Sequence, residues 1–280
     1  MKVSVIIPSL ASDKTKPYLR ECVESLRATT DWDIIVVTNG INAPEPLNID
    51  GITKRLHTRD QGQCNAVNIG FQLIEPNTDY VMICNDDMYF APGWNKNLRF
   101  DYPCFSPNLI EPVNNSGSAE PFLKFDGGLT IEDFKQTDIN LYIKAKINSL
   151  EVMFKGELIK NEESGFNFPV FIKKDLWNLI GGYDIAYDPW GSNGDTDLQT
   201  KINLAGVTPM RLTDVLVYHF SSKSGTFDGS HQDFYQNNIE YFKQKFGFDR
   251  DELESDVWYN KSMIPDDKSK IKYHQEKYNG

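Results

Sequence analysis

Short apolar runs alternate with amphipathic stretches through the first hundred positions of the chain. Buried strands are predicted where the run is short and rich in apolar residues, at 3–7, 34–37 and 80–84, and a weaker strand is predicted near 52–56. Helices are predicted from about residue 17 and over 62–73, because apolar side chains there recur at helical spacing. Alternation of strand and helix is typical of an α/β fold, with a twisted, mostly parallel sheet flanked by helices.

The pattern weakens between residues 101 and 165, where Pro, Asn, Gly and Ser are frequent. Loops, a short helix near 131–136 and an antiparallel strand pair are expected there. Regular patterns then return, as strands near 168–172, 208–212 and 215–220 and as helices over 176–180, 195–205 and 233–246. We therefore expect one Rossmann-like domain over residues 1–247, followed by a charged C-terminal extension over 248–280.

Composition narrows the class of protein. The chain has 280 residues with 40% hydrophobic side chains, enough for the core of one large domain. Its net charge of −11 disfavours broad contacts with nucleic acid or an anionic membrane. No apolar run approaches the ~20 residues of a membrane span, and residues 1–8 do not suit a signal peptide. The four cysteines are scattered without a CxxC pair, which favours reduced, buried thiols and a cytoplasmic location.

Polar residues follow two of the predicted strands. Asn39 comes after the second strand, and Asn85-Asp86-Asp87 follows the strand at 80–84. Ligands of open parallel sheets bind beyond the carboxyl ends of the strands. Adjacent carboxylates repel each other, and a hard divalent cation relieves that repulsion. An ordinary polar turn is the alternative interpretation, because Asn and Asp are also frequent in turns.

The segment Val81 to Asp87, followed by Ala91-Pro92-Gly93-Trp94, resembles the DxD region of family 2 glycosyltransferases of the GT-A fold. Residues 3–9 are similar to the opening strand of that family. Residues 60–62 with 66–70 resemble its N-x-G-x-x-x-A-R-N-x-G segment, although Asp60 and Val67 depart from the pattern.

The second half of the chain carries further matches in the family's order. Ile180-Gly181-Gly182-Tyr183-Asp184 resembles its G-G-[FY]-D segment, and residues 194–198 resemble E-D-x-D-L with Gly194 in place of Glu. Trp190-Gly191 is similar to the W-G-x-G-x-E-D loop of galactosyltransferase-like enzymes. Val217-Tyr218-His219-Phe220 resembles the later metal-binding His segment.

The resemblance implies an inverting glycosyltransferase that moves a sugar from a nucleotide-sugar donor to an acceptor hydroxyl, with UDP expected because the family uses it often. It implies Asp195 as general base and Asp87 with His219 as ligands of Mn²⁺ or Mg²⁺. Residues 1–100 would bind the donor and 101–247 the acceptor. The donor-binding residues are expected to be Pro8, Ser9, Asn39, Asp60, Gly62, Asn68, Asn85 and Asp86. The acceptor-binding residues are expected to be Gly182, Trp190 and Asp197.

Plainer roles remain open for these residues. His219 is also explained as a satisfied surface or core histidine, Trp190 as packing, and Asp195 and Asp197 as helix N-terminal charges. A catalytically inactive binding module is a rival interpretation, because Asn85, Val67 and Gly194 depart from the motifs. A nucleotidyltransferase is another, although no Gly-rich basic loop follows the first strand, and the missing G-x-G-x-x-G disfavours a dinucleotide-binding oxidoreductase.

The sequence leaves the acceptor open. A saccharide, a glycolipid or another hydroxyl acceptor would fit the implied reaction. The acidic net charge disfavours a nucleic acid acceptor.

Overall fold

The structure is a computed structural model. It describes residues 1–40, 47–59, 62–113, 123–154, 159–160, 167–221, 223 and 232–249.

The first part of the chain alternates strand and helix as the apolar pattern predicts. Its elements are β1 (Val3–Ser9), α1 (Lys16–Thr29), β2 (Asp33–Asn39), β3 (Lys54–Thr58), α2 (Gln63–Gln72), β4 (Tyr80–Ile83) and β5 (Met88–Tyr89). All seven residues of β1 are buried, because the strand lies inside the sheet with helices on both sides. The sequence-based boundaries of these elements are confirmed to within a few residues, except for β5, which was not predicted.

The second part of the chain mixes long and very short elements. Its strands are β6 (Cys104–Glu111), β7 (Leu123–Lys124), β8 (Ile159–Lys160), β9 (Val170–Lys173) and β10 (Met210–His219). Its helices are α3 (Gln136–Phe154), α4 (Lys174–Ile180), the 3-10 turn η1 (Ile185–Tyr187), α5 (Gly194–Leu204) and α6 (Gln232–Phe246).

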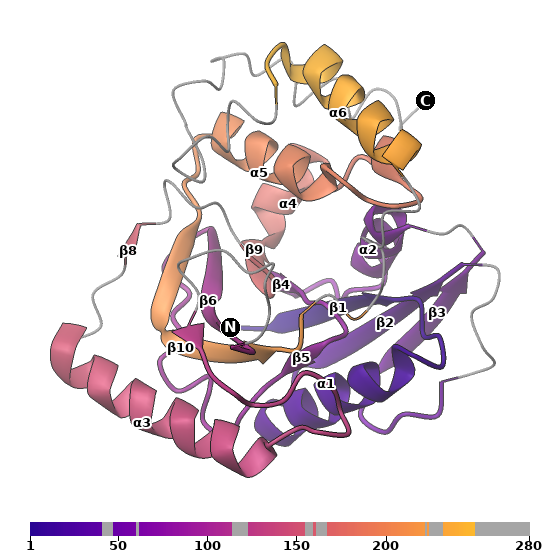
Figure 1. The fold of residues 1–280 in the computed structure, drawn as a ribbon. Coiled ribbons are helices and arrows are strands. Elements are labelled where there is room, and N and C mark those ends of the chain that lie inside the picture. The colour runs from indigo at the N-terminus through magenta and orange to yellow at the C-terminus, as the bar shows by residue number, and fades with distance from the viewer. Residues whose placement is uncertain are drawn as a thin grey trace.

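One curled sheet joins both parts, in the order β3-β2-β1-β4-β9-β6-β10-β5. The strands β3, β2, β1 and β4 are parallel, and β10 is parallel to β6. Strand β9 runs antiparallel between β4 and β6 and so connects the two parallel groups. Helix α1 covers one face of the sheet, while α2, α4, α5 and α6 lie on the other (Figure 1). The predicted α/β fold with a mostly parallel sheet is confirmed.

Alternate residues of β1 pack into two separate hydrophobic clusters. Val5 and Ile7 belong to the cluster that packs under α1, whereas Ile6 belongs to the cluster beneath α2, α4 and α5. Helix α2 approaches β1 so closely that a Cβ on Gly70 would lie 2.4 Å from Cγ2 of Ile6. At the other end of α2, the N–H of its N-cap residue Gly62 donates to Asn39, so the helix begins at the end of β2.

The segment between residues 101 and 165 departs from the expectation of loops and a short helix. Strand β6 is fully buried over eight residues, and the 19-residue helix α3 begins where the predicted short helix was to end. Pro107 lies in the segment for which its Pro and Asn content predicts loops, but it pairs with Leu212 next to a register shift between Leu212 and Leu216. A proline without an N–H fits at such an irregularity. The same irregularity lies within β10, where two separate strands were predicted.

The C-terminal boundary was expected at residue 247, but Phe248 is buried with Phe242 and Phe246 in the second core cluster. The rest of the predicted charged extension, from residue 250, lies outside the described residues. All four cysteines are buried and free, as their spacing predicts. Among the described residues, no helix is both long enough and apolar enough to cross a membrane.

Candidate functional site

The carboxyl ends of β1, β2 and β4 bring several predicted donor-binding residues together. Ser9 ends β1, and its hydroxyl donates a hydrogen bond of 2.5 Å to Oδ2 of Asp86, just after β4. Asn39 ends β2, and its amide donates to the carbonyl oxygen of Ser9 at 3.3 Å. The Asn39 Oδ1 accepts a bond of 3.1 Å from the backbone N–H of Gly62. These four residues therefore form one connected polar edge of the sheet.

The predicted metal ligands also meet at this edge. His219 ends β10, which pairs antiparallel with β5, and so its ring reaches the loop before β5. The Nε2 of His219 lies 3.3 Å from Oδ1 of Asp87, and the Nδ1 lies 3.0 Å from Oε1 of Glu111. The N–H of Phe220 donates to the carbonyl oxygen of Asp87 at 3.0 Å, which fixes the two segments together.

Glu111 was not predicted as a site residue. It is the last residue of β6 and is 3% exposed. The sequence did not predict it because Pro107 and the following Asn-rich segment are typical of loops, so no buried strand was expected there. The position of Glu111 could have indicated its role, because it is a carboxylate at the end of a buried strand, as Asp87 is just after β4.

The electrostatics of this cluster favour additional positive charge. Burial, together with the neighbouring Asp87, raises the pKa of Asp86 to about 7. Burial is the largest effect on the pKa of Asp87 and acts to raise it, but the charge of His219 and the hydrogen bonds from His219 and from the Lys223 N–H together outweigh burial, so the pKa is lowered. Burial lowers the pKa of His219, yet the Asp87 and Glu111 carboxylates overcome this and raise it to about 10. Buried carboxylates thus hold the imidazole in its charged form. A cation bound at its Nε2 would take the place of the proton on that nitrogen.

A divalent cation fits this donor set. Within the described residues no three His, Cys, Asp or Glu side chains form a ready metal cage. The Asp87 and His219 groups nevertheless face each other, and Glu111 holds the far nitrogen of the ring as carboxylates do behind metal-binding histidines. A carboxylate and an imidazole are ligand types that would suit the expected Mn²⁺ or Mg²⁺.

Lys223 adds a basic group that sequence reasoning missed. Its backbone N–H donates to Oδ2 of Asp87 at 3.3 Å. Burial lowers the pKa of its ammonium group, while Asp87 acts in the opposite direction. A partly desolvated ammonium beside a carboxylate suits a site for a multiply charged anion.

On the other side of α2, Gly182 and Asn68 contact each other directly. Gly182 has a φ of +71°, and a Cβ there would lie 2.7 Å from Oδ1 of Asn68 and 2.9 Å from the Trp177 ring. The Asn68 side chain donates to the carbonyl oxygen of Tyr183 and accepts from its N–H, both at 2.9 Å. These contacts fasten the Gly-Gly-Tyr turn to α2, so the Asn68 amide has a structural role.

The two predicted carboxylates at the start of α5 lie in different surroundings. Asp195 is exposed, and its Oδ1 accepts a hydrogen bond of 2.8 Å from the Tyr183 hydroxyl. Asp197 is 0% exposed and lies within 3.0 Å of Lys201 and 2.5 Å of Lys245. Asp197 therefore stabilises the interior, and its side chain does not face the solvent where an acceptor would bind.

Gly194, which replaces Glu in the motif, has a packing explanation. A Cβ at this position would lie 2.8 Å from Sγ of the buried Cys64. A larger residue would push α5 away from α2. The departure from the motif follows from how these two helices pack together.

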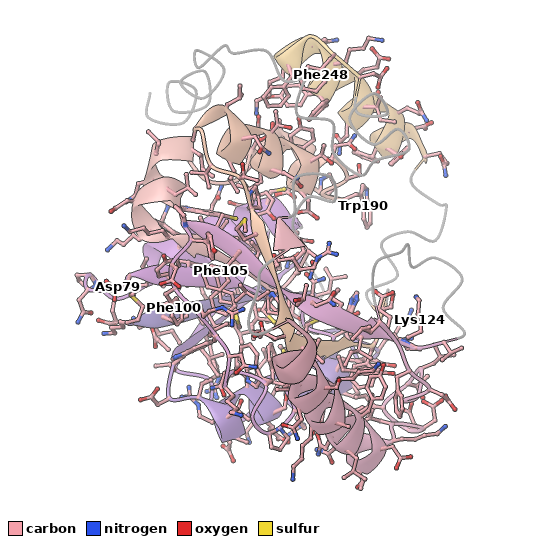
Figure 2. The ribbon with its side chains drawn as sticks, turned by 90° about the vertical axis from the view of Figure 1, so that its left-hand side faces the viewer. Asp79, Phe100, Phe105, Lys124, Trp190 and Phe248 are labelled. Carbon is pink, nitrogen blue, oxygen red and sulfur yellow. The ribbon has the colours of Figure 1, made fainter. Side chains whose placement is uncertain are left out.

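Trp190 lies in the loop before α5 and is partly buried. Its ring centroid is 6.4 Å from that of Phe234 on α6, with an interplanar angle of 68°. In Figure 2, Trp190 stands beneath α6, apart from the aromatic core around Phe105. Phe234 is 44% exposed, so the pair presents aromatic surface next to the loop that leads into α5.

Three further residues were predicted to bind the donor: Pro8, Asn85 and Asp60. Pro8 is buried within β1 and pairs with Val37, and Asn85 is partly buried after β4. Asp60 lies outside the described residues.

Comparison with known proteins agrees with this geometry. Residues 4–99, about a third of the chain, match the family model described as Glycosyl transferase family 2. No curated protein matches the sequence. A crystal structure of S. aureus TarS 1–349 has 15% identity and a TM-score of 0.53, with 91% of this chain and 74% of that one covered. GalNAc-T7 with UDP, GalNAc and Mn²⁺ has 16% identity and a TM-score of 0.56, with 99% and 55% covered.

The resemblance to family 2 glycosyltransferases of the GT-A fold is therefore confirmed: the N-terminal part carries the family's sequence pattern, and the whole described chain has the fold. At these identities the structural likeness shows the fold alone. The roles of individual residues rest on the geometry of this chain.

Proposed function

We propose that this chain is an inverting glycosyltransferase that transfers a sugar from a nucleotide-sugar donor, with UDP as the expected nucleotide, to an acceptor hydroxyl. The observation that carries the proposal is the Asp87–His219–Glu111 cluster beside the Ser9–Asp86 contact, at the carboxyl ends of the parallel strands. TarS has been crystallised with UDP-GlcNAc and GalNAc-T7 with UDP, GalNAc and Mn²⁺, which supports this class of donor and a divalent cation.

In this proposal the polar edge around Ser9, Asn39 and Gly62 binds the nucleoside, together with Pro8 and Asn85 at its border. Asp86 contacts the ribose or a metal-bound water. Asp87 and His219 hold Mn²⁺ or Mg²⁺, which, when bound, neutralises the charge that develops on the departing diphosphate. Lys223 supplies a second positive charge to the same diphosphate.

Asp195 is the proposed general base. Its carboxylate is exposed at the first turn of α5, where the helix dipole favours the ionised form. The hydrogen bond from the Tyr183 hydroxyl to Oδ1 orients the carboxylate, which in this proposal takes the proton of the acceptor hydroxyl. The new C–O bond forms on the face of the anomeric carbon opposite to the breaking bond, so one base without a covalent intermediate gives inversion.

The acceptor is proposed to bind beside Gly182 and Trp190, with Phe234 completing the aromatic surface. A saccharide, a glycolipid or another hydroxyl-bearing molecule would fit this surface, and the acidic chain disfavours nucleic acid. The four buried free thiols suit a reducing compartment, so a cytoplasmic location is part of the proposal.

Two alternatives remain as test outcomes. An inactive module would bind the nucleotide sugar without turnover, and a nucleotidyltransferase would release pyrophosphate from a nucleoside triphosphate.

A donor-hydrolysis screen tests the proposal. The purified chain is incubated with a panel of nucleotide sugars, with Mn²⁺ or EDTA, and released nucleoside diphosphate is measured. Slow hydrolysis of one donor that EDTA and Asp87→Asn both abolish would support the proposal. If no donor is bound or hydrolysed in a metal-dependent way, the proposal is wrong, whereas metal-dependent binding without release points to the inactive module or a missing acceptor.

A further inference from the structure

We propose that Asp188 is a positioning residue that fixes the donor-binding segment of this chain against its acceptor-binding segment. The proposal rests on the proposed function for the roles of the two segments. Asp188 lies between η1 and Trp190 and belongs to none of the sequence motifs. Its contacts reach across the molecule to the start of α2.

The Asp188 carboxylate caps helix α2 from a distant part of the chain. Its Oδ1 accepts a hydrogen bond of 3.2 Å from the N–H of Cys64, and its Oδ2 accepts one of 2.8 Å from the N–H of Asn65. The N-terminal amides of a helix have no partner within the helix. The N-cap residue of α2 is Gly62, which has no side chain to accept them. An ionised carboxylate at this end also interacts favourably with the helix dipole.

Gly62 makes room for this cap. Its φ is +152°, and a Cβ built on it would lie 2.1 Å from Cγ of Asp188. Any side chain at position 62 would therefore displace the carboxylate. The Gly62 N–H donates to Asn39, whose amide donates to Ser9, and Ser9 in turn donates to Asp86. A continuous line of contacts thus runs from Asp188 to the carboxylates of the proposed donor site.

On the acceptor side, Asp188 is part of the loop that leads to Asp195. Its own N–H donates to Ile185 at 3.1 Å, and the N–H of Gly191 donates to Tyr187 at 2.9 Å. Asn238 of α6 holds the same loop by donating to the carbonyl oxygens of Tyr187 at 2.9 Å and Ser192 at 3.0 Å. The loop is therefore held by α6 on one side and, through Asp188, by α2 on the other.

Asp188→Ala tests the inference, with Arg99→Ala as the matched control. Arg99 makes a two-bond ion pair with Asp214, partway along β10 and away from the site, so its loss also costs stability. The affinity for UDP in the presence of Mn²⁺ is measured by calorimetry at a temperature where all proteins are folded. Losing a helix cap that shapes the pocket should weaken UDP binding about tenfold in Asp188→Ala. Arg99→Ala should stay within about twofold of the wild type. Equal effects of the two variants, or no effect of either, would overturn the proposal.

A double-mutant cycle sharpens the test. Gly62→Ala should weaken UDP binding mainly by displacing Asp188, so its effect should be smaller in the Asp188→Ala background than alone. Additive effects would mean that the two positions act independently, against the proposal.

Hydrogen exchange separates this inference from the proposed function. If the wild type binds no nucleotide, the proposed function fails, and the exchange rates of backbone amides still report on Asp188. Asp188→Ala should then speed exchange both at residues 64–65 and at residues 190–195, while Arg99→Ala should not. Faster exchange at the start of α2 alone would show a simple cap and overturn the coupling of the two segments.

Discussion

Lys245 on α6 offers a strong test of how the interior is stabilised. Its ammonium nitrogen lies 2.8 Å from Oδ2 of Asp184 and 2.5 Å from Oδ2 of Asp197, and all three side chains are at most 1% exposed. Lys201 lies 3.0 Å from the other oxygen of Asp197, so two lysines balance two carboxylates. The hydroxyl of Tyr241 also donates to Asp184 at 2.8 Å. We predict that Lys245→Met is severely destabilising, because it leaves a buried negative charge without its partner.

The size of the effect follows from what buried charges cost. Removing one partner of a buried ion pair typically costs about 3–5 kcal/mol in the free energy of unfolding. At about 2–4 °C per kcal/mol for a chain of this size, the melting temperature should fall by about 6–20 °C. The matched control is Lys243→Met on the same helix. Lys243 pairs with Asp249 at 3.3 Å, but its side chain is 53% exposed, and pairs of that kind are worth about 0–1 kcal/mol.

Thermal and urea unfolding, followed by circular dichroism, measure both variants against the wild type. The reasoning predicts a large loss for Lys245→Met and a shift of about 4 °C or less for Lys243→Met. If both variants lose the same small amount of stability, the buried cluster does not stabilise the fold as argued. Should Lys245→Met fail to fold, Lys245→Arg keeps the charge and should recover folded protein.

Three further predictions concern the proposed site. Asp195→Asn should lower the rate of sugar transfer at least about 100-fold while leaving the affinity for UDP with Mn²⁺ unchanged, and a parallel loss of nucleotide affinity would speak against a general base. Phe234→Ala should raise the KM for a saccharide acceptor about tenfold without changing donor hydrolysis, whereas Phe234→Tyr should retain the wild-type KM. Asp188 should make folding stability depend on pH, because burial raises its pKa from 3.8 to about 6. The folded state then holds this proton more tightly than the unfolded state. Protonation of Asp188 therefore stabilises the folded state fully below about pH 4. This stabilisation, about 2–3 kcal/mol at most, is lost as the pH rises through 6. Unfolding curves of Asp188→Asn across this range should lack that slope, and an unchanged slope would contradict the assignment.

The parallel half of the fold could be predicted because local pattern and tertiary environment agree there. Residues 3–7, 34–37 and 80–84 are short apolar runs, and they form buried strands as such runs do in parallel sheets. Because the ends of such strands meet at one edge, the proximity of Ser9, Asn39 and Asp86 also follows from the sequence.

The remaining half depends on contacts that local sequence does not reveal. Pro107 is compatible with β6 only because a register shift in β10 adjoins it. Asp197 reads as a helix N-terminal charge, yet the burial of Lys201 and Lys245 around it becomes visible only in three dimensions. Glu111 and Asp188 each act on residues more than 100 positions away, at His219 and Cys64, so no local motif marks them.

Metal-dependent nucleotide binding is the most direct test of the central claim. UDP and GDP are titrated by calorimetry into the wild type, Asp87→Asn and Arg99→Ala, each with Mn²⁺ and with EDTA. The account predicts that one nucleotide binds the wild type and Arg99→Ala only when Mn²⁺ is present, and that Asp87→Asn loses this binding. Binding that is equally strong in EDTA, or that survives Asp87→Asn, would contradict the assignment of Asp87 and His219 as the cation-binding pair.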